Sequence, residues 1–136
     1  MRRIIKACCV LLIIAVPGIM IVPSFARSAS AQGCRLVICL EADGAGDAPF
    51  NIRIEDGGKT DKKALVDMGP CIQESFDPPN TLKVTESPMP GWVLDDVVCT
   101  DLKGIKITKT KDGFAAECAS SGEGGCTLEN EEGTAR

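Results

Sequence analysis

Histidine and tyrosine are absent from this 136-residue sequence, and tryptophan occurs once, at Trp92. Without histidine, the Ser–His and Cys–His pairs that activate nucleophiles in ordinary hydrolases are excluded. The eight cysteines include no C-x-x-C pair, which argues against a zinc site. The composition therefore favours a protein that is not an enzyme and that holds no metal or other cofactor.

The first 31 residues have the three-part pattern of a secretory signal peptide. A basic start precedes an apolar run over residues 7–22, and small residues end in Ala-Ser-Ala before Gln32. We expect cleavage there and secretion to the extracellular space or the periplasm. One alternative is a retained membrane anchor, for which the apolar run is short and interrupted by Pro17. The other is lipidation of Cys34, whose preceding residues resemble a lipobox only loosely.

The chain after cleavage holds 11 basic and 19 acidic residues, a net charge of −8. We expect it to bind neither nucleic acid nor anionic membrane, and to have no membrane span once the signal is removed. The length fits one domain over residues 32–130, followed by an acidic flexible tail over 131–136. Six cysteines in a secreted chain predict three disulfides, each typically worth about 2–4 kcal/mol. They are Cys34, Cys39, Cys71, Cys99, Cys118 and Cys126.

Apolar and polar residues alternate with the period of a β-strand in several short segments separated by turn residues. Residues 35–40 are instead almost continuously apolar, as in a strand that is covered on both faces. Asp95 and Asp96 predict a bulge or bend in a longer strand over 92–99, and residues 60–68 are the only candidate for a helical turn. The pattern predicts an all-β fold: a single antiparallel, Ig-like β-sandwich of seven or eight short strands, held by disulfides. The other expected strands cover 50–55, 71–76, 81–85, 104–108, 114–118 and 127–130, and one of the expected turns covers 122–125.

The segment 82–92, Leu-Lys-Val-Thr-Glu-Ser-Pro-Met-Pro-Gly-Trp, resembles the "tVtE-x-x-P-x-GW" motif of bacterial prealbumin-like domains. Residues 97–100 and 126–130 resemble two further strand motifs of these SpaA-like sandwiches. The family is found in pilins, adhesins and secreted surface proteins. The resemblance therefore implies a structural or adhesive module at the cell surface, with a protein or glycan partner and with self-association as a further option.

Many members of that family join a first-strand Lys to a last-strand Asn through an isopeptide bond, beside a buried acid. Asn130 and Glu86 match the Asn and acid positions, whereas the alignment places Cys39 at the Lys position. Without that amine the bond cannot form in the family's way, so the resemblance implies that a disulfide takes its place. Glu86 is then expected to be a turn or edge acid. It also implies that Cys99 pairs with Cys126.

The remaining disulfide pairs stay open. Cys34 and Cys39 would lie roughly 16 Å apart on one extended strand, too far to be bridged to each other. They then pair with Cys71 and Cys118 in either order, and a hairpin pair Cys118–Cys126 competes.

Three further features each have an ordinary structural interpretation that we favour. Four lysines between residues 103 and 111 are expected to protect a sheet edge, although they also suit an anionic partner. Acidic glycine-rich segments at 43–47 and 56–61 lack a full calcium ligand pattern. Trp92 is expected to be a core aromatic rather than an exposed binding platform.

The leading functional hypothesis is a non-catalytic secreted or surface module that engages its partner through loops or through a sheet edge. The alternative is a small disulfide-rich inhibitor or effector that presents a rigid loop, either 77–80 or 88–91.

Overall fold

The computed structural model describes residues 33–133 as seven β-strands, and no helix in that range is long and apolar enough to cross a membrane. The expected signal peptide and the last three residues of the expected tail lie outside the described residues. The strands are β1 (Cys34–Glu41), β2 (Phe50–Asp56), β3 (Lys59–Leu65), β4 (Ile72–Phe76), β5 (Thr81–Glu86), β6 (Trp92–Thr110) and β7 (Gly113–Glu132).

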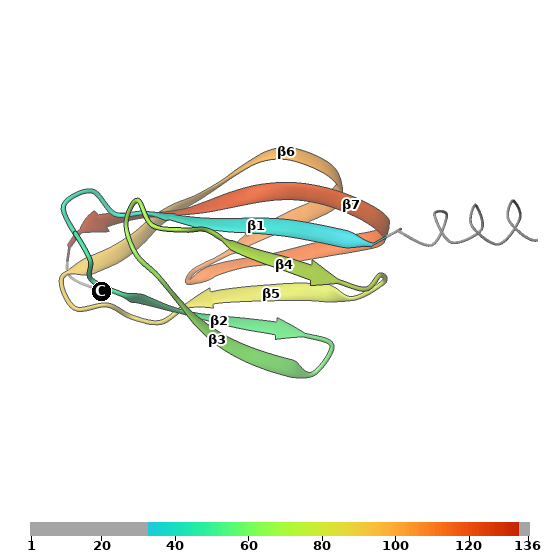
Figure 1. The fold of residues 1–136 in the computed structure, drawn as a ribbon, viewed down its shortest axis with the longest axis horizontal. Coiled ribbons are helices and arrows are strands. Elements are labelled where there is room, and N and C mark those ends of the chain that lie inside the picture. The colour runs from blue at the N-terminus through green and yellow to red at the C-terminus, as the bar shows by residue number, and fades with distance from the viewer. Residues whose placement is uncertain (1–32, 134–136) are drawn as a thin grey trace, which may run out of the picture. The chain divides into compact units, whose positions relative to one another are not determined.

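The strands pair in the order β3-β2-β5-β7-β1-β4, and β6 pairs with β7 outside this path (Figure 1). The path folds into two layers, because β7 pairs with β5 along its first part and with β1 along its second. The predicted disulfide-held β-sandwich is confirmed, with one difference in strand direction. β1 and β7 run parallel, so the sheet is mixed rather than purely antiparallel.

β6 and β7 span 19 and 20 residues, where the sequence predicted four short strands. Each runs through one layer, bends over, and returns through the other, as the orange and red ribbons of Figure 1 show. The expected turn at residues 122–125 is instead strand. Gly122 is needed at the bend because a Cβ there would lie 2.5 Å from the backbone oxygen of Lys103. The predicted bulge at Asp95 is confirmed by a register shift between Leu94 and Asp96.

The prediction of a helical turn at residues 60–68 is wrong, since most of this segment forms β3. Gly57 and Gly58 both have positive φ, which allows the tight turn that folds β3 back on to β2. The two strands then pair in register from Phe50–Leu65 to Asp56–Lys59. Backbone pairing with a neighbour thus overrides the helical preference of the lysines and alanine.

Alternate residues of each strand point into the space between the layers, where they form one apolar core. Phe50 and Phe114 are its largest fully buried side chains. Leu36, Ile38 and Leu40 contribute from β1, while the residues between them face outward. β7 continues past residue 130, the expected end of the domain, to pair Glu132 with Trp92.

Candidate functional site

Two polar side chains are buried inside the apolar core, at the end where β5 and β7 finish. Glu86 ends β5 and is 7% exposed, and Asn130 lies near the end of β7 and is 9% exposed. Asn130 Nδ2 donates a hydrogen bond of 3.0 Å to Glu86 Oε2. The structure therefore brings together the two residues that match the acid and Asn positions of the family motif.

Backbone pairing holds both residues in place. Glu86 lies opposite Ile52 of β2, and its N–H donates to the Asp112 carbonyl at 2.7 Å. Asn130 lies opposite Leu94 of β6. At the same end of the sandwich the rings of Phe50 and Trp92 pack edge to face, with centroids 5.9 Å apart. Trp92 is half-buried against the core, as expected for a core aromatic.

The electrostatics of the pair are those of a carboxyl group in an apolar setting. Burial raises the pKa of Glu86, and the hydrogen bond from Asn130 opposes that shift only in part. Within residues 33–133 no lysine or arginine forms an ion pair with Glu86. Asn130 Oδ1 is also buried and lacks a hydrogen-bond partner. A protonated Glu86 carboxyl would be able to donate to that oxygen.

The interpretation of Cys39 as the residue at the Lys position needs correction. Side chains alternate along β1, so Cys39 faces outward, away from the core that holds Asn130. The core-facing residues of β1 include Leu36, Ile38 and Leu40, and none of them carries an amine. The pair is therefore an acid and an amide without a nucleophile on β1.

Three disulfides connect the strands and resolve the pairing that the sequence left open. Cys99 is bonded to Cys126, the pair that the resemblance implied, with Cα atoms 4.0 Å apart. The other two are Cys34–Cys118 and Cys39–Cys71, with Cα separations of 6.3 and 4.5 Å. The competing Cys118–Cys126 pair is not formed. The sulfur of Cys34 is committed to a disulfide, which leaves no thiol there for a lipid.

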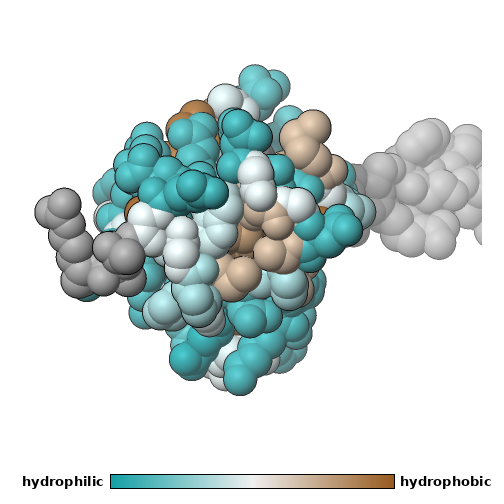
Figure 2. All heavy atoms as spheres, turned by 90° about the vertical axis from the view of Figure 1, so that its left-hand side faces the viewer, coloured by the Kyte–Doolittle hydropathy of each residue, from teal (hydrophilic) through white to brown (hydrophobic). Residues whose placement is uncertain are grey.

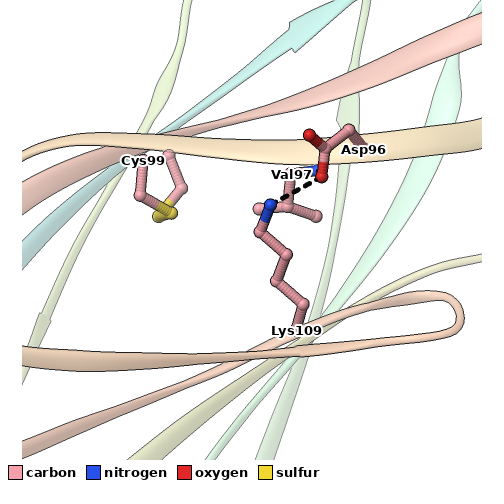
Figure 3. Close-up of a disulfide and its surroundings, with 5 residues drawn as sticks. Asp96, Val97, Cys99 and Lys109 are labelled. Atoms are coloured by element: carbon pink, nitrogen blue, oxygen red, sulfur yellow. Dashed lines mark hydrogen bonds and ion pairs between the residues drawn. A yellow bond between two sulfur atoms is a disulfide. The ribbon is translucent and has the colours of Figure 1, made fainter.

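Two ion pairs close the open sides of the sandwich. On one side Lys63 of β3 hydrogen-bonds Glu74 of β4, and this bond raises the pKa of Lys63. On the other side Lys109 lies 2.7 Å from Asp96, in the opposite half of β6, next to the Cys99–Cys126 disulfide (Figure 3). The hydrogen bond from Lys109 lowers the pKa of Asp96. Each lysine therefore links the edges of the two layers.

Two more lysines of the run, Lys103 and Lys106, pair within the hairpin of β6 and β7. Lys103 lies 4.0 Å from Glu123, and Lys106 lies 3.9 Å from Glu117. Their charges are thus balanced locally by acids of β7. The acidic segments considered for calcium lie in the β1–β2 loop and around the β2–β3 turn, and no three acidic or cysteine side chains gather into a metal site between residues 33 and 133.

Three loops meet at the end of the sandwich that also holds Glu86 and Asn130. They are residues 42–49, 66–71 and 87–91, and we call them the loop end (Figure 1). Met68 is 91% exposed there and has a left-handed φ of 58°, a conformation that costs a side-chain-bearing residue about 1–2 kcal/mol. Figure 2 looks on to this end, where less hydrophilic residues gather near the middle and hydrophilic residues surround them. Sequence reasoning missed Met68, since one apolar residue beside a glycine gives no signal of exposure.

Comparison with known proteins finds similarity in structure but not in sequence. No protein-family model and no curated protein matches this chain. A bacterial adhesin from Mobiluncus mulieris, which contains intramolecular disulfide, isopeptide and ester cross-links, superposes with a TM-score of 0.56 at 16% identity. The match covers 74% of this chain and 41% of the adhesin. The chain has the fold of a bacterial adhesin domain.

A second solved structure is the major pilin protein T-13 from Streptococcus pyogenes. It is 13% identical, with a TM-score of 0.42, and the match covers 75% of this chain and 46% of the pilin. This chain thus spans less than half the length of either structure. The resemblance to adhesin modules that the sequence motifs predicted is confirmed for the fold by the adhesin structure.

Proposed function

We propose that this chain is a non-catalytic, secreted or surface-exposed structural or adhesive module that binds a protein or glycan partner through its loop end. The observation that carries the proposal is the exposure of apolar side chains at the loop end. Of the three large apolar side chains that are exposed in the described part of the chain, Met68 is by far the most exposed, and it projects from a loop. Apolar patches rimmed by polar residues are typical of contact sites. At this end less hydrophilic residues gather near the middle, with hydrophilic residues around them (Figure 2).

The closed sides of the sandwich support contact through loops rather than through a sheet edge. Lys63 on edge strand β3 points inward to Glu74, and Lys109 on β6 points inward to Asp96. Inward-pointing charges and bulges hinder the addition of another strand to an edge. β6 carries such a bulge at Asp95. Of the two contact modes considered from the sequence, the geometry favours the loops.

The buried pair supports a structural rather than a catalytic role. Glu86 is hydrogen-bonded to an amide, and no second carboxylate or nucleophile is hydrogen-bonded to it among residues 33–133. A general acid must reach its substrate, whereas this carboxyl is 7% exposed. Turnover by the purified protein that Glu86→Gln abolishes would overturn the non-catalytic assignment.

One observation favours the inhibitor alternative. The loop at 87–91 is held rigidly, because Trp92 N–H donates to the Met89 carbonyl at 3.0 Å and the two residues form a β-bridge. A rigid loop loses little entropy on binding, as an inhibitor requires. The other candidate loop, 77–80, lies at the opposite end of the sandwich from the loop end.

The test uses the oxidised chain from Gln32 onward, immobilised and probed with a panel of extracellular proteins, glycans and secreted hydrolases. We expect retention of a surface protein or glycan, lost at least tenfold in Met68→Asp. Thr108→Asp is the matched control, because it places the same charge on an exposed strand position away from the loop end. Tight binding of a single hydrolase in a one-to-one complex would favour the inhibitor. Equal loss in both variants, or no retained partner, would refute the loop end as the binding surface.

A further inference from the structure

The described part of the chain contains three disulfides, and the fold shields two of them from solvent. Cys34 and Cys118 belong to the apolar core and are 1% and 2% exposed. Cys126 belongs to the same core at 2% exposed, and its partner Cys99 packs against that core. Thiol–disulfide exchange requires a thiolate to reach one of the two sulfurs, so access limits its rate. Exchange at these two disulfides should therefore be slow while the chain is folded.

The third disulfide faces outward. Cys39 is half-buried on the outer side of β1, Cys71 is exposed at the end of the loop 66–71, and neither belongs to the apolar core. β1 pairs with β4 as far as Ile38 opposite Ile72, so the disulfide joins the next two residues across the same pair of strands. β4 is an edge strand, and no further strand pairs with it on its free side. Of these three disulfides, Cys39–Cys71 is the one that a dissolved thiol reaches most readily.

The same disulfide is one of two tethers on the loop that carries Met68. The other tether is a hydrogen bond of 2.9 Å from the Ala42 N–H to Asp67 Oδ1, which ties the loop to the end of β1. Met68 lies between the two, one residue after Asp67 and three residues before Cys71. The position of Met68 at the loop end therefore depends on both tethers.

Met68 needs such tethers because its backbone is strained. Its φ of 58° lies in the left-handed region, which side chains other than glycine rarely adopt. Strained residues persist only where the surrounding structure fixes them. The Met68 side chain is 91% exposed, so its own packing contributes little to that restraint. Opening the disulfide should allow the backbone of Met68 to relax and its side chain to leave the position that it holds in the fold.

We propose that Cys39–Cys71 is a thiol-exchange site, through which a dithiol controls the presentation of Met68 at the loop end. The dithiol is a small molecule or a pair of cysteines on another protein. The inference rests on the proposed function, since it names the site that regulates contact through Met68. The fold itself should persist after reduction, because β4 still pairs with β1 and keeps Ile72 and Phe76 buried.

The exchange consists of two displacement steps. One thiolate of the dithiol attacks Cys71 Sγ, and the electron pair of the broken S–S bond leaves on Cys39 Sγ, which takes a proton from water. The second thiolate of the dithiol then displaces Cys71 from the mixed disulfide, and the Cys71 thiolate also takes a proton. The two cysteines gain two electrons, and the dithiol loses two as it closes its own disulfide. The reverse exchange restores the tether.

The first test measures the order in which the disulfides open. The oxidised chain from Gln32 onward is treated with a low concentration of dithiothreitol, quenched with iodoacetamide at intervals, and mapped by mass spectrometry of its peptides. We expect Cys39 and Cys71 to be alkylated at least tenfold faster than the other four cysteines of the three disulfides. In denaturing urea the three disulfides should open at similar rates, because the fold and not the local sequence selects the site.

The second test measures the loop by amide hydrogen exchange. The Ala42 amide reports the tether to Asp67, and the Gly69 amide reports the turn of the loop, in which it donates to the Val66 carbonyl at 3.1 Å. In the double change of Cys39 and Cys71 to Ser, both amides should exchange at least tenfold faster than in the oxidised chain. The amides of β2 and β5 should be unchanged, which checks that the variant is folded.

The matched control is the double change of Cys99 and Cys126 to Ser. It removes a disulfide of similar sequence separation, 27 residues against 32, that does not involve the loop 66–71. The Ala42 and Gly69 amides should therefore keep the exchange rates of the oxidised chain. Equal acceleration of both amides in this control would show that general loosening, and not the tether, governs the loop.

Equal or faster opening of a core disulfide would overturn the proposal, and so would unchanged exchange of the two loop amides after removal of Cys39–Cys71. Full retention of a Met68-dependent partner by the reduced chain would overturn control of Met68 by this site. The opening rates and the loop amides are measured without a partner. Selective opening with a loosened loop, but with no Met68-dependent partner, would thus refute the proposed function alone.

Discussion

Replacing Glu86 by Gln should stabilise the fold at neutral and alkaline pH. The ionised carboxylate is buried, receives one hydrogen bond from Asn130, and has no cation paired with it in the described part of the chain. A Gln amide keeps the shape and accepts the same bond. It also has N–H groups that are able to donate to Asn130 Oδ1, which now lacks a partner.

The size of the effect follows from that unsatisfied oxygen. A buried acceptor without a partner costs about 1–3 kcal/mol, so Glu86→Gln should raise the free energy of unfolding by about that amount at pH 8. The gain should depend on pH. Because the pKa of Glu86 is raised in the fold, its stabilising contribution is complete below the ordinary value of 4.5 and is lost as pH rises through the folded value. Near pH 4, where the carboxyl is protonated in the folded protein, the two proteins should be nearly equal.

The measurement is urea unfolding of both proteins with disulfides intact, at pH 4 and pH 8. Glu117→Gln is the matched control, since it removes one negative charge at an exposed position of β7 and should change stability by less than about 0.5 kcal/mol. Destabilisation of Glu86→Gln at pH 8 would show that the ionised form is the better partner for Asn130. An equal difference at both pH values would show that burial does not govern this carboxyl, and either result refutes the argument.

Three further changes test other parts of the fold. The double change of Cys34 and Cys118 to Ser opens a cross-link that spans 84 residues and should lower the free energy of unfolding by about 4–5 kcal/mol, read from the urea midpoint. Lys109→Met should raise the pKa of Asp96 towards its ordinary value in an NMR titration, and an unchanged pKa would show that the ion pair does not form in solution. Gly122→Ala should cost about 1–3 kcal/mol in a thermal melt, because its Cβ would meet the backbone of the facing strand at 2.5 Å, and an unaltered melt would contradict the close approach.

The sequence predicted the sandwich wherever apolar and polar residues alternate strictly. In β2, Phe50, Ile52 and Ile54 face the core and the residues between them face outward, as their order predicted. It did not predict how far strands extend. Glycine usually signals a turn, but the glycines of residues 122–125 lie in a bend where two strands approach closely. These two roles can be told apart only when the position of the neighbouring strand is known.

The candidate site was predictable in part. The motif around Glu86 and the closing strand with Asn130 matched both residues to the family's acid and Asn positions, and the structure places them within hydrogen-bond distance. The expectation that Glu86 is a turn or edge acid was wrong, because its side chain is buried in the core. The position of Cys39 was misread because β1 is apolar on both faces, which hides the alternation that separates inward from outward residues. The same loss of signal left the partners of Cys34 and Cys39 undecided, since disulfide pairing depends on layers that a single sequence does not define.

The Cys34–Cys118 disulfide also decides how the domain would respond to being pulled by its ends. Cys34 begins β1 at one end of the sandwich, and β7 runs from the bend near Cys118 to the opposite end, where the chain leaves (Figure 1). Tension entering at Cys34 therefore crosses the disulfide directly into β7, which is already extended. The 84-residue span between the two cysteines stays out of the load path. Until that disulfide is reduced, the domain should behave as a short, nearly inextensible tether.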